Sequence, residues 1–198
     1  VFSTEAYNAI CEFLGANWYA LAGTLILAAG VVVHLVYATA LTLHNRSSRG
    51  SQRYAMTAEP EGVTWASRNM YVLGIIIVLG LLLHLYNFWY NMQFAEIIGN
   101  HELGPFPPAD GAAYIAALFS SPVYCIIYLV WFAAIWFHLT HGFWSAFHTI
   151  GWDNQTWLPR LKRIANVVAT IVFLCFALVV IVFYLRSLGV CGGSCAGF

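Results

Sequence analysis

Charged side chains are scarce in this chain. Asp, Glu, Lys and Arg account for 8% of its 198 residues, whereas 61% are hydrophobic, and an ordinary soluble domain carries about a quarter charged residues. This scarcity excludes a domain folded in water. The apolar runs also lack the alternation of barrel strands, and only helices or closed barrels satisfy their backbone in lipid. The sequence therefore predicts an all-α membrane protein, a single transmembrane helical bundle over residues 1–198.

Four apolar runs are long enough to cross a bilayer, because a spanning helix needs about 20 mostly apolar residues. They cover about residues 17–43, 70–92, 120–147 and 164–185. The third run begins near Tyr114 and is too long for one crossing. Proline fits the first turn of a helix but breaks its interior. We therefore expect Ser120, Ser121 and Pro122 to separate an outer, interfacial piece from the span itself.

Lys and Arg are absent from two segments of this arrangement. Neither the segment before the first span nor residues 94–113 contain a cation, although they hold five acidic residues. By the positive-inside rule the two basic loops are cytoplasmic, and nothing in the pattern suggests nucleic-acid binding. Cys191 and Cys195 then fall on the external side, where a disulfide can persist. The basic loops carry Arg46, Arg49, Arg53, Arg68, Arg160, Lys162 and Arg163.

Three of the seven histidines, His34, His84 and His138, lie within otherwise apolar spans. An ionisable side chain inside the bilayer is expensive and marks a functional site by default. A hydrogen bond to a neighbouring helix could explain any one of them, but three together favour a shared role. His44, at a span end, and His101, in an external loop, are typical interfacial and surface residues.

The depth of the three histidines decides how they can pair. At a rise of about 1.5 Å per residue, His34 and His138 each lie about 14 Å from the cytoplasmic end of their span. His84 lies about 12 Å from the external end of its own span. Two imidazoles at one depth suit the axial positions of a haem iron. His84 needs a partner at its own level, and no other histidine in these four spans supplies one.

Small residues and further histidines surround the proposed pair. Small residues let a planar cofactor or simply another helix come close. His141 shares the face of His138, and with His148 and Arg46 it either holds haem propionates or lines the membrane boundary. The cluster HLTHG(x5)H is also compatible with a membrane di-iron enzyme, although the basic loops hold no further histidine. The small residues are Gly30, Ala38, Gly74, Gly80 and Gly142.

The phrases VVVHLVYA, LLLHLYNFWYN and FHLTHGFWSAFHTIGW, in this order and spacing, resemble the cytochrome b membrane anchor of succinate dehydrogenase or fumarate reductase. The resemblance is to the single-subunit, five-helix, two-haem type and covers nearly the whole chain. It implies that His34 and His138 ligate the inner haem and that His84 is one ligand of the outer haem. Family members carry a further N-terminal helix with the fourth ligand, so we expect a helix to be missing from this sequence and two haems b in the full-length protein.

The resemblance further implies electron transfer in a bacterial cytoplasmic membrane. A flavoprotein subunit with FAD would interconvert succinate and fumarate, an iron–sulfur subunit would dock on the cytoplasmic loops, and menaquinone would exchange electrons with the haems. Quinone reduction takes up protons, for which Glu12, Glu96 and Asn87 are external candidates. Trp136 stands where some fumarate reductases carry a glutamate. A cytochrome b subunit of a hydrogenase or formate dehydrogenase remains the alternative.

Overall fold

The computed structural model describes residues 3–15, 17–49, 63–152 and 154–190, and every regular element within them is a helix. Four stretches are long and apolar enough to cross a membrane, which confirms the predicted all-α, multi-pass architecture. They are α2 (Trp18–Arg49), α4 (Met70–His84) continued by the π-helix η1 (Leu85–Phe94) and α5 (Ala95–Ile98), α7 (Pro122–Thr149), and α8 (Trp157–Ser187).

Three of the four spanning stretches, all except α7, are longer than the apolar runs that predicted them. α8 begins at Trp157 rather than near residue 164, and α2 extends to Arg49. Hydropathy marks only the part of a helix that sits in hydrocarbon, whereas backbone hydrogen bonding continues into the interface. Arg160, Lys162 and Arg163 therefore occupy the first turns of α8 rather than a loop.

The break expected at Pro122 is present. Helix α6 (Gly111–Leu118) ends before it, and α7 starts with Pro122 in its first turn after the extended residue Ser121. Proline has no N–H to lose at this position, because the first N–H groups of a helix have no partner within the helix. Asp110 begins α6, where its side chain accepts a hydrogen bond from the Ala113 N–H at 3.2 Å.

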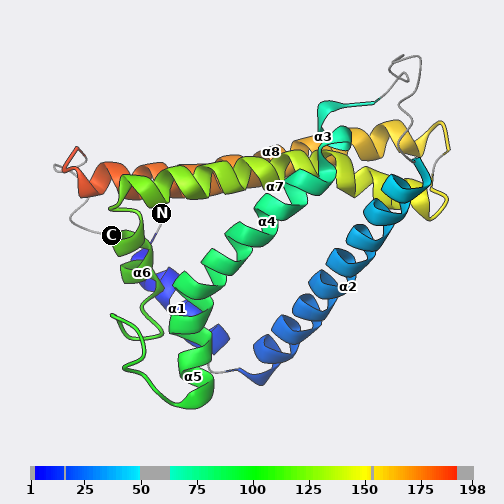
Figure 1. Cartoon of the computed structure of the whole chain (residues 1–198). Helices are drawn as coiled ribbons and strands as arrows, with labels where there is room; N and C mark the ends of the chain where they lie inside the picture. Colours follow the sequence, from blue (N-terminus) through cyan, green and yellow to red (C-terminus); the bar gives the residue numbers. More distant parts are fainter. Residues whose placement is uncertain (1–2, 16, 50–62, 153, 191–198) are drawn as a thin grey trace.

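Helices α7 and α8 lie side by side along their length, and α4 crosses α7 obliquely (Figure 1). The best-packed core lies between these helices and the end of α6. Trp136 links α7 to α8 through a hydrogen bond from its indole nitrogen to the Thr170 hydroxyl at 3.0 Å. The buried members of this core are Phe119, Cys125, Tyr128, Trp131 and Val180.

Helix α2 packs differently from the other three spans. Figure 1 shows its N-terminal part well separated from α7 and α8, and none of the 18 residues in its most apolar window is buried. Thr24 provides one link to the rest of the chain, since its hydroxyl donates to Gln93 Oε1 of η1 at 3.1 Å. An apolar helix with so little protein around it is covered by lipid or by a molecule that the protein binds.

Short helices close the two ends of the bundle. Helix α1 (Thr4–Gly15) joins α6 through Asn8, whose amide nitrogen donates to Asp110 Oδ1 at 2.8 Å and whose amide oxygen accepts from the Ala112 N–H at 3.0 Å. Helix α3 (Trp65–Arg68) packs at the opposite end, with the Trp65 and Phe137 rings 5.1 Å apart.

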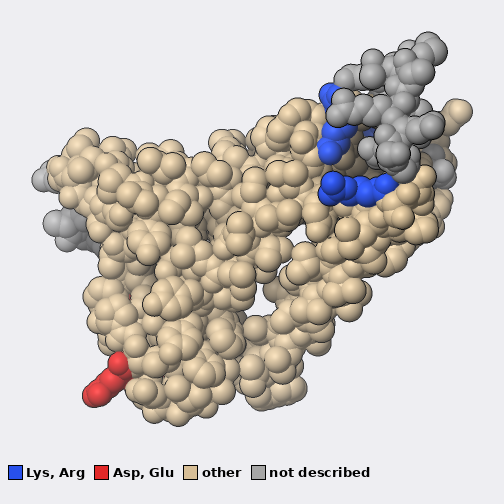
Figure 2. Space-filling view, viewed as in Figure 1, with Lys and Arg blue, Asp and Glu red and all other residues tan. Residues whose placement is uncertain are grey.

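Charge separates these two ends as the sequence predicts. Figure 2 shows Lys and Arg side chains gathered where α2, α3, α7 and α8 meet, and an acidic side chain at the far end of the molecule. The basic end is the one that the positive-inside rule assigns to the cytoplasm. Arg53, Cys191, Cys195 and the side chain of Arg49 lie outside the described residues.

Candidate functional site

His34 on α2 and His138 on α7 lie next to each other. Their ring centroids are 6.1 Å apart and the ring planes meet at 75°. The two histidines are 104 positions apart in the sequence, so only the arrangement of the helices brings them together. This proximity is what the equal depth of the two residues predicts.

A cavity of about 780 Å³ opens beside this pair, between α2, α4 and α7. Its volume lies within the range of about 300–1,000 Å³ that is usual for ligand sites. Its lining is mostly aliphatic and includes both imidazoles. Gly30 and Gly74 border open space, because a Cβ atom built on either would have no neighbour within 4 Å. Figure 2 shows openings through the surface beside α2.

The separation of the two ring centroids fits two imidazoles bound to one metal. With metal–nitrogen bonds of about 2.0 Å, imidazoles on opposite sides of an iron have ring centroids about 6 Å apart. In addition, the buried Nδ1 of His138 has no hydrogen-bond partner among the described residues. An unpaired buried polar atom costs about 1–3 kcal/mol, so this site favours a partner from outside the chain.

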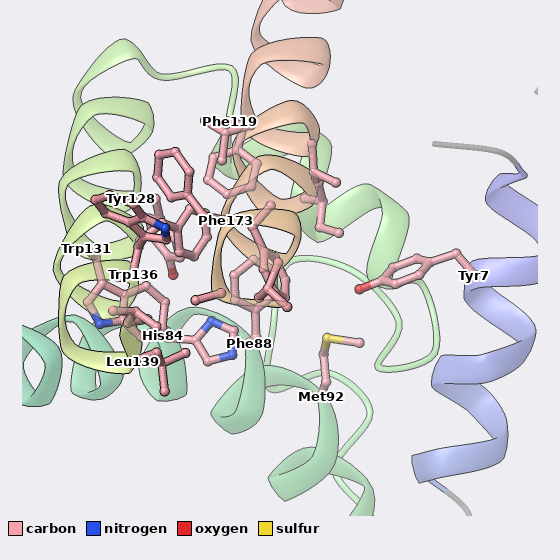
Figure 3. A pocket seen from close by; sticks show the side chains of 18 residues that line it. Tyr7, His84, Phe88, Met92, Phe119, Tyr128, Trp131, Trp136, Leu139 and Phe173 are labelled. Carbon is pink, nitrogen blue, oxygen red and sulfur yellow. The ribbon is translucent and has the colours of Figure 1, made fainter. Parts of the chain in front are cut away.

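His84 lines a different cavity, of about 450 Å³, between α4, η1, α7 and α8. Figure 3 shows its imidazole among aromatic side chains, with Trp131 and Tyr128 from α7 and Phe88 from η1. The two cavities share no lining residue. His84 is therefore separate from the His34–His138 pair, in agreement with the depth argument, and its buried Nδ1 also has no partner among the described residues.

The helix changes form directly after His84. Residues Leu85–Phe94 form a π-helix, a rare structure that often occurs at functional sites. Within these wider turns, the side-chain amide of Asn91 donates to the backbone carbonyls of Tyr86 at 3.0 Å and Asn87 at 3.1 Å. Asn87 in turn donates to the Tyr128 hydroxyl at 3.1 Å. The π-helix thus turns an amide toward α7, just beyond His84.

Tyr7 reaches the His84 cavity from α1, where it lies near Met92 (Figure 3). Burial and the neighbouring Cys11 raise the pKa of the Tyr7 phenol from 10.0 to about 12. Burial also raises the pKa of the Cys11 thiol. Both groups are therefore neutral at physiological pH, and α1 presents an uncharged surface to this cavity.

The predicted propionate-binding residues lie at the basic end of the bundle. His141 packs its ring 5.0 Å from that of Trp144, and the Lys162 ammonium lies 4.2 Å from the Trp144 ring centroid on α7. The buried Nδ1 of His141 has no partner among the described residues. His148 and Arg46 are exposed. None of the three predicted residues lines either cavity.

The predicted quinone residues lie toward the opposite end, also outside the lining of these cavities. Glu12 is exposed on α1, and Glu96 Oε1 lies 3.6 Å from Nδ1 of the exposed His101. Asn87 reaches the lining of the His84 cavity through its hydrogen bond to Tyr128. Sequence reasoning missed Tyr7, Tyr128 and Trp131 as cavity residues. The spacing of Tyr128 and Trp131 on one face of α7 was the signal for the latter two.

No protein-family model, curated protein or solved structure matches this chain. Among the described residues, no group of three or more His, Cys, Asp or Glu side chains converges as a metal site. A di-iron centre needs such a group, and the HLTHG(x5)H cluster does not form one here. An axial pair on haem needs only two imidazoles, because the macrocycle supplies the other ligands.

Proposed function

We propose that this chain is a haem b-carrying membrane anchor of a succinate dehydrogenase or fumarate reductase, which passes electrons between an iron–sulfur subunit and menaquinone. The observation that carries the proposal is the His34–His138 pair, with ring centroids 6.1 Å apart beside a cavity of about 780 Å³. The resemblance of three histidine-containing phrases to this family supplies the identity of the complex.

His34 and His138 would hold the inner haem, with Gly30 and Gly74 leaving space for the ring. His84 would ligate the outer haem, together with a ligand from outside these residues. Bound haem supplies one-electron transfer. The protein would supply the imidazoles that hold the haem, an apolar wall that excludes water, and the spacing of the two sites across the membrane.

Residues at the two ends would serve the partners of this reaction. His141, His148 and Arg46 lie at the basic end, where propionates of an inner haem would emerge and the iron–sulfur subunit, bound to an FAD-containing flavoprotein, would dock. Glu12, Glu96 and Asn87 lie toward the external end, where menaquinone would exchange protons. This arrangement corresponds to a multi-pass protein of the bacterial cytoplasmic membrane.

The test is haem binding by single variants of the full-length protein. His34→Ala and His138→Ala should each remove the same haem, measured as the haem-to-protein ratio and the reduced-minus-oxidised spectrum. His44→Ala and His101→Ala are matched controls and should leave the spectrum unchanged. Loss of haem in His141→Ala with retention in His138→Ala would show that the wrong histidine of α7 had been chosen.

Copurification separates the proposed complex from the alternative. A succinate dehydrogenase or fumarate reductase brings an FAD-containing subunit and succinate-linked quinone reduction. Hydrogen- or formate-linked activity in the purified complex would instead assign the chain to another oxidoreductase.

A further inference from the structure

The indole of Trp131 packs directly on Gly80 of α4, at a place where any larger side chain would overlap it. A Cβ atom at Gly80 would overlap the Trp131 ring, and the indole Nε1 donates to the Ile77 carbonyl at 3.0 Å. Ile77, Gly80 and His84 follow each other at intervals of three and four residues, so they share one face of α4. The indole, itself 8% exposed, is thus fixed against this face by shape and by one hydrogen bond.

This indole forms one wall of the His84 site. Its ring centroid lies 5.5 Å from that of the His84 imidazole, with 33° between the planes. Phe88 and Tyr128 flank the imidazole at 5.1 Å and 6.4 Å. Histidines that bind metals are usually oriented by a hydrogen bond from the other ring nitrogen. His84 Nδ1 has no such partner among the described residues, so the flanking rings set its orientation.

We propose that Trp131 is the positioning residue of His84: seated on Gly80 and bound to the Ile77 carbonyl, its indole fixes the imidazole plane beside the cavity. The proposal rests on the proposed function, in which His84 is an axial ligand of haem, and deepens it. Trp131 would act through its contact with His84 and not as a ligand. Gly80 acts through Trp131, because the absence of a side chain at Gly80 leaves the space that the indole occupies.

Electron paramagnetic resonance of the oxidised full-length protein tests this role, because the g values of a bis-histidine haem depend on the orientation of the imidazole planes. The relevant signal is the one that disappears in His84→Ala. Trp131→Leu and Gly80→Ala should shift and broaden it. Trp131→Phe keeps a ring at this place but loses the hydrogen bond, and should give a smaller shift.

A double variant distinguishes positioning from general loosening of the bundle. If Gly80 acts only through the indole, adding Gly80→Ala to Trp131→Leu should cause no further shift, a strong departure from additivity. Additive shifts would overturn the chain of action from Gly80 to Trp131 to His84.

Matched controls come from the same chain. Leu79→Ala changes the residue next to Gly80 on the same helix, which is 61% exposed and lines neither cavity, and Trp157→Leu removes a tryptophan that is 51% exposed. Both should leave the His84-dependent signal in place, and the signal that disappears in His34→Ala is an internal control in every variant. An unchanged His84-dependent signal in Trp131→Leu would overturn the proposal.

A second readout keeps this inference distinguishable from the haem assignment. The second readout is the ¹⁵N NMR spectrum of protein with labelled histidine, reduced with dithionite and reconstituted in lipid nanodiscs. The resonance of His84 is identified as the one that is absent from the His84→Gln variant. We expect one narrow resonance in the wild type and a broadened or multiple one in Trp131→Leu and Trp131→Phe. If no haem signal depends on His84, the proposal that His84 ligates an outer haem is refuted. A His84 resonance unchanged by both Trp131 variants overturns the positioning role whether or not haem is bound there.

Discussion

Replacing Gly30 by larger residues can show whether the cavity beside His34 is empty or holds haem. Gly30 lies one helical turn before His34, lines the cavity of about 780 Å³, and has no atom within 4 Å of a Cβ built on it. Gly30→Ala should stabilise the helix by about 0.5–1 kcal/mol, because glycine is less favourable than alanine within a helix. Because the Cβ position is open and the side chain would enter the cavity, even Gly30→Phe should leave the helix folded.

Haem in this cavity would compete with the phenylalanine ring for the same space. We therefore expect Gly30→Phe to lose the haem that depends on His34 and His138, while helix content by circular dichroism stays normal. Gly30→Ala should retain most of this haem. The assay is the haem-to-protein ratio in lipid nanodiscs. Ala29→Phe is the matched control, since Ala29 is the next residue on α2, is exposed, and lines neither cavity.

A normal haem content in Gly30→Phe would refute the placement of haem between α2, α4 and α7. Loss of haem in Ala29→Phe as well would show that the phenylalanine acts by disturbing α2 rather than by filling the site.

Three further predictions concern other parts of the molecule. Tyr128→Phe removes the hydroxyl that accepts from Asn87 and should lower the free energy of unfolding by about 1 kcal/mol. Tyr128→Ala removes a whole ring from the core and should lower the free energy of unfolding by about 3–5 kcal/mol. Steric trapping in bicelles measures both values. Because the pKa of Tyr7 is raised from 10.0 to about 12, an unfolded chain loses this proton first, so stability should fall as the pH rises through that window. Thermal unfolding of Tyr7→Phe should lack this part of the fall, and identical profiles would contradict the assignment. Charge reversal at the basic end should weaken salt-sensitive binding of the iron–sulfur partner while the haem spectrum stays normal; an unchanged yield of complex would place the partner elsewhere. The residues to reverse are Arg160, Lys162 and Arg163.

Depth and hydropathy predicted the features that depend on position along a helix. The four spans follow from apolar length, and the start of α7 follows from Pro122. The common level of His34 and His138 follows from their equal distance to the cytoplasmic ends, because a fixed rise per residue converts sequence position into depth. These inferences need no knowledge of how neighbouring helices are rotated.

Contacts that depend on rotation and crossing could not be predicted. The seat of Trp131 on Gly80 requires α4 to cross α7 at one particular place, and glycine in a membrane helix is common enough to mean simple packing. The π-helix after His84 depends on side-chain amides that bind backbone carbonyls, as Asn91 does. Tyr7 enters the His84 cavity only because α1 folds back onto α6.

The sparse packing of α2 has a consequence for assembly of the protein. A ligand that binds only the docked arrangement stabilises it by mass action, by about 4 kcal/mol when the free ligand is at 1,000 times its dissociation constant. Helix α2 has no buried residue in its apolar window, so little of its docking energy comes from the rest of the chain. Supply of cofactor during synthesis would then set the fraction of chains in which α2 is docked. In cells short of haem, the subunit should be degraded rather than accumulate as a folded apoprotein.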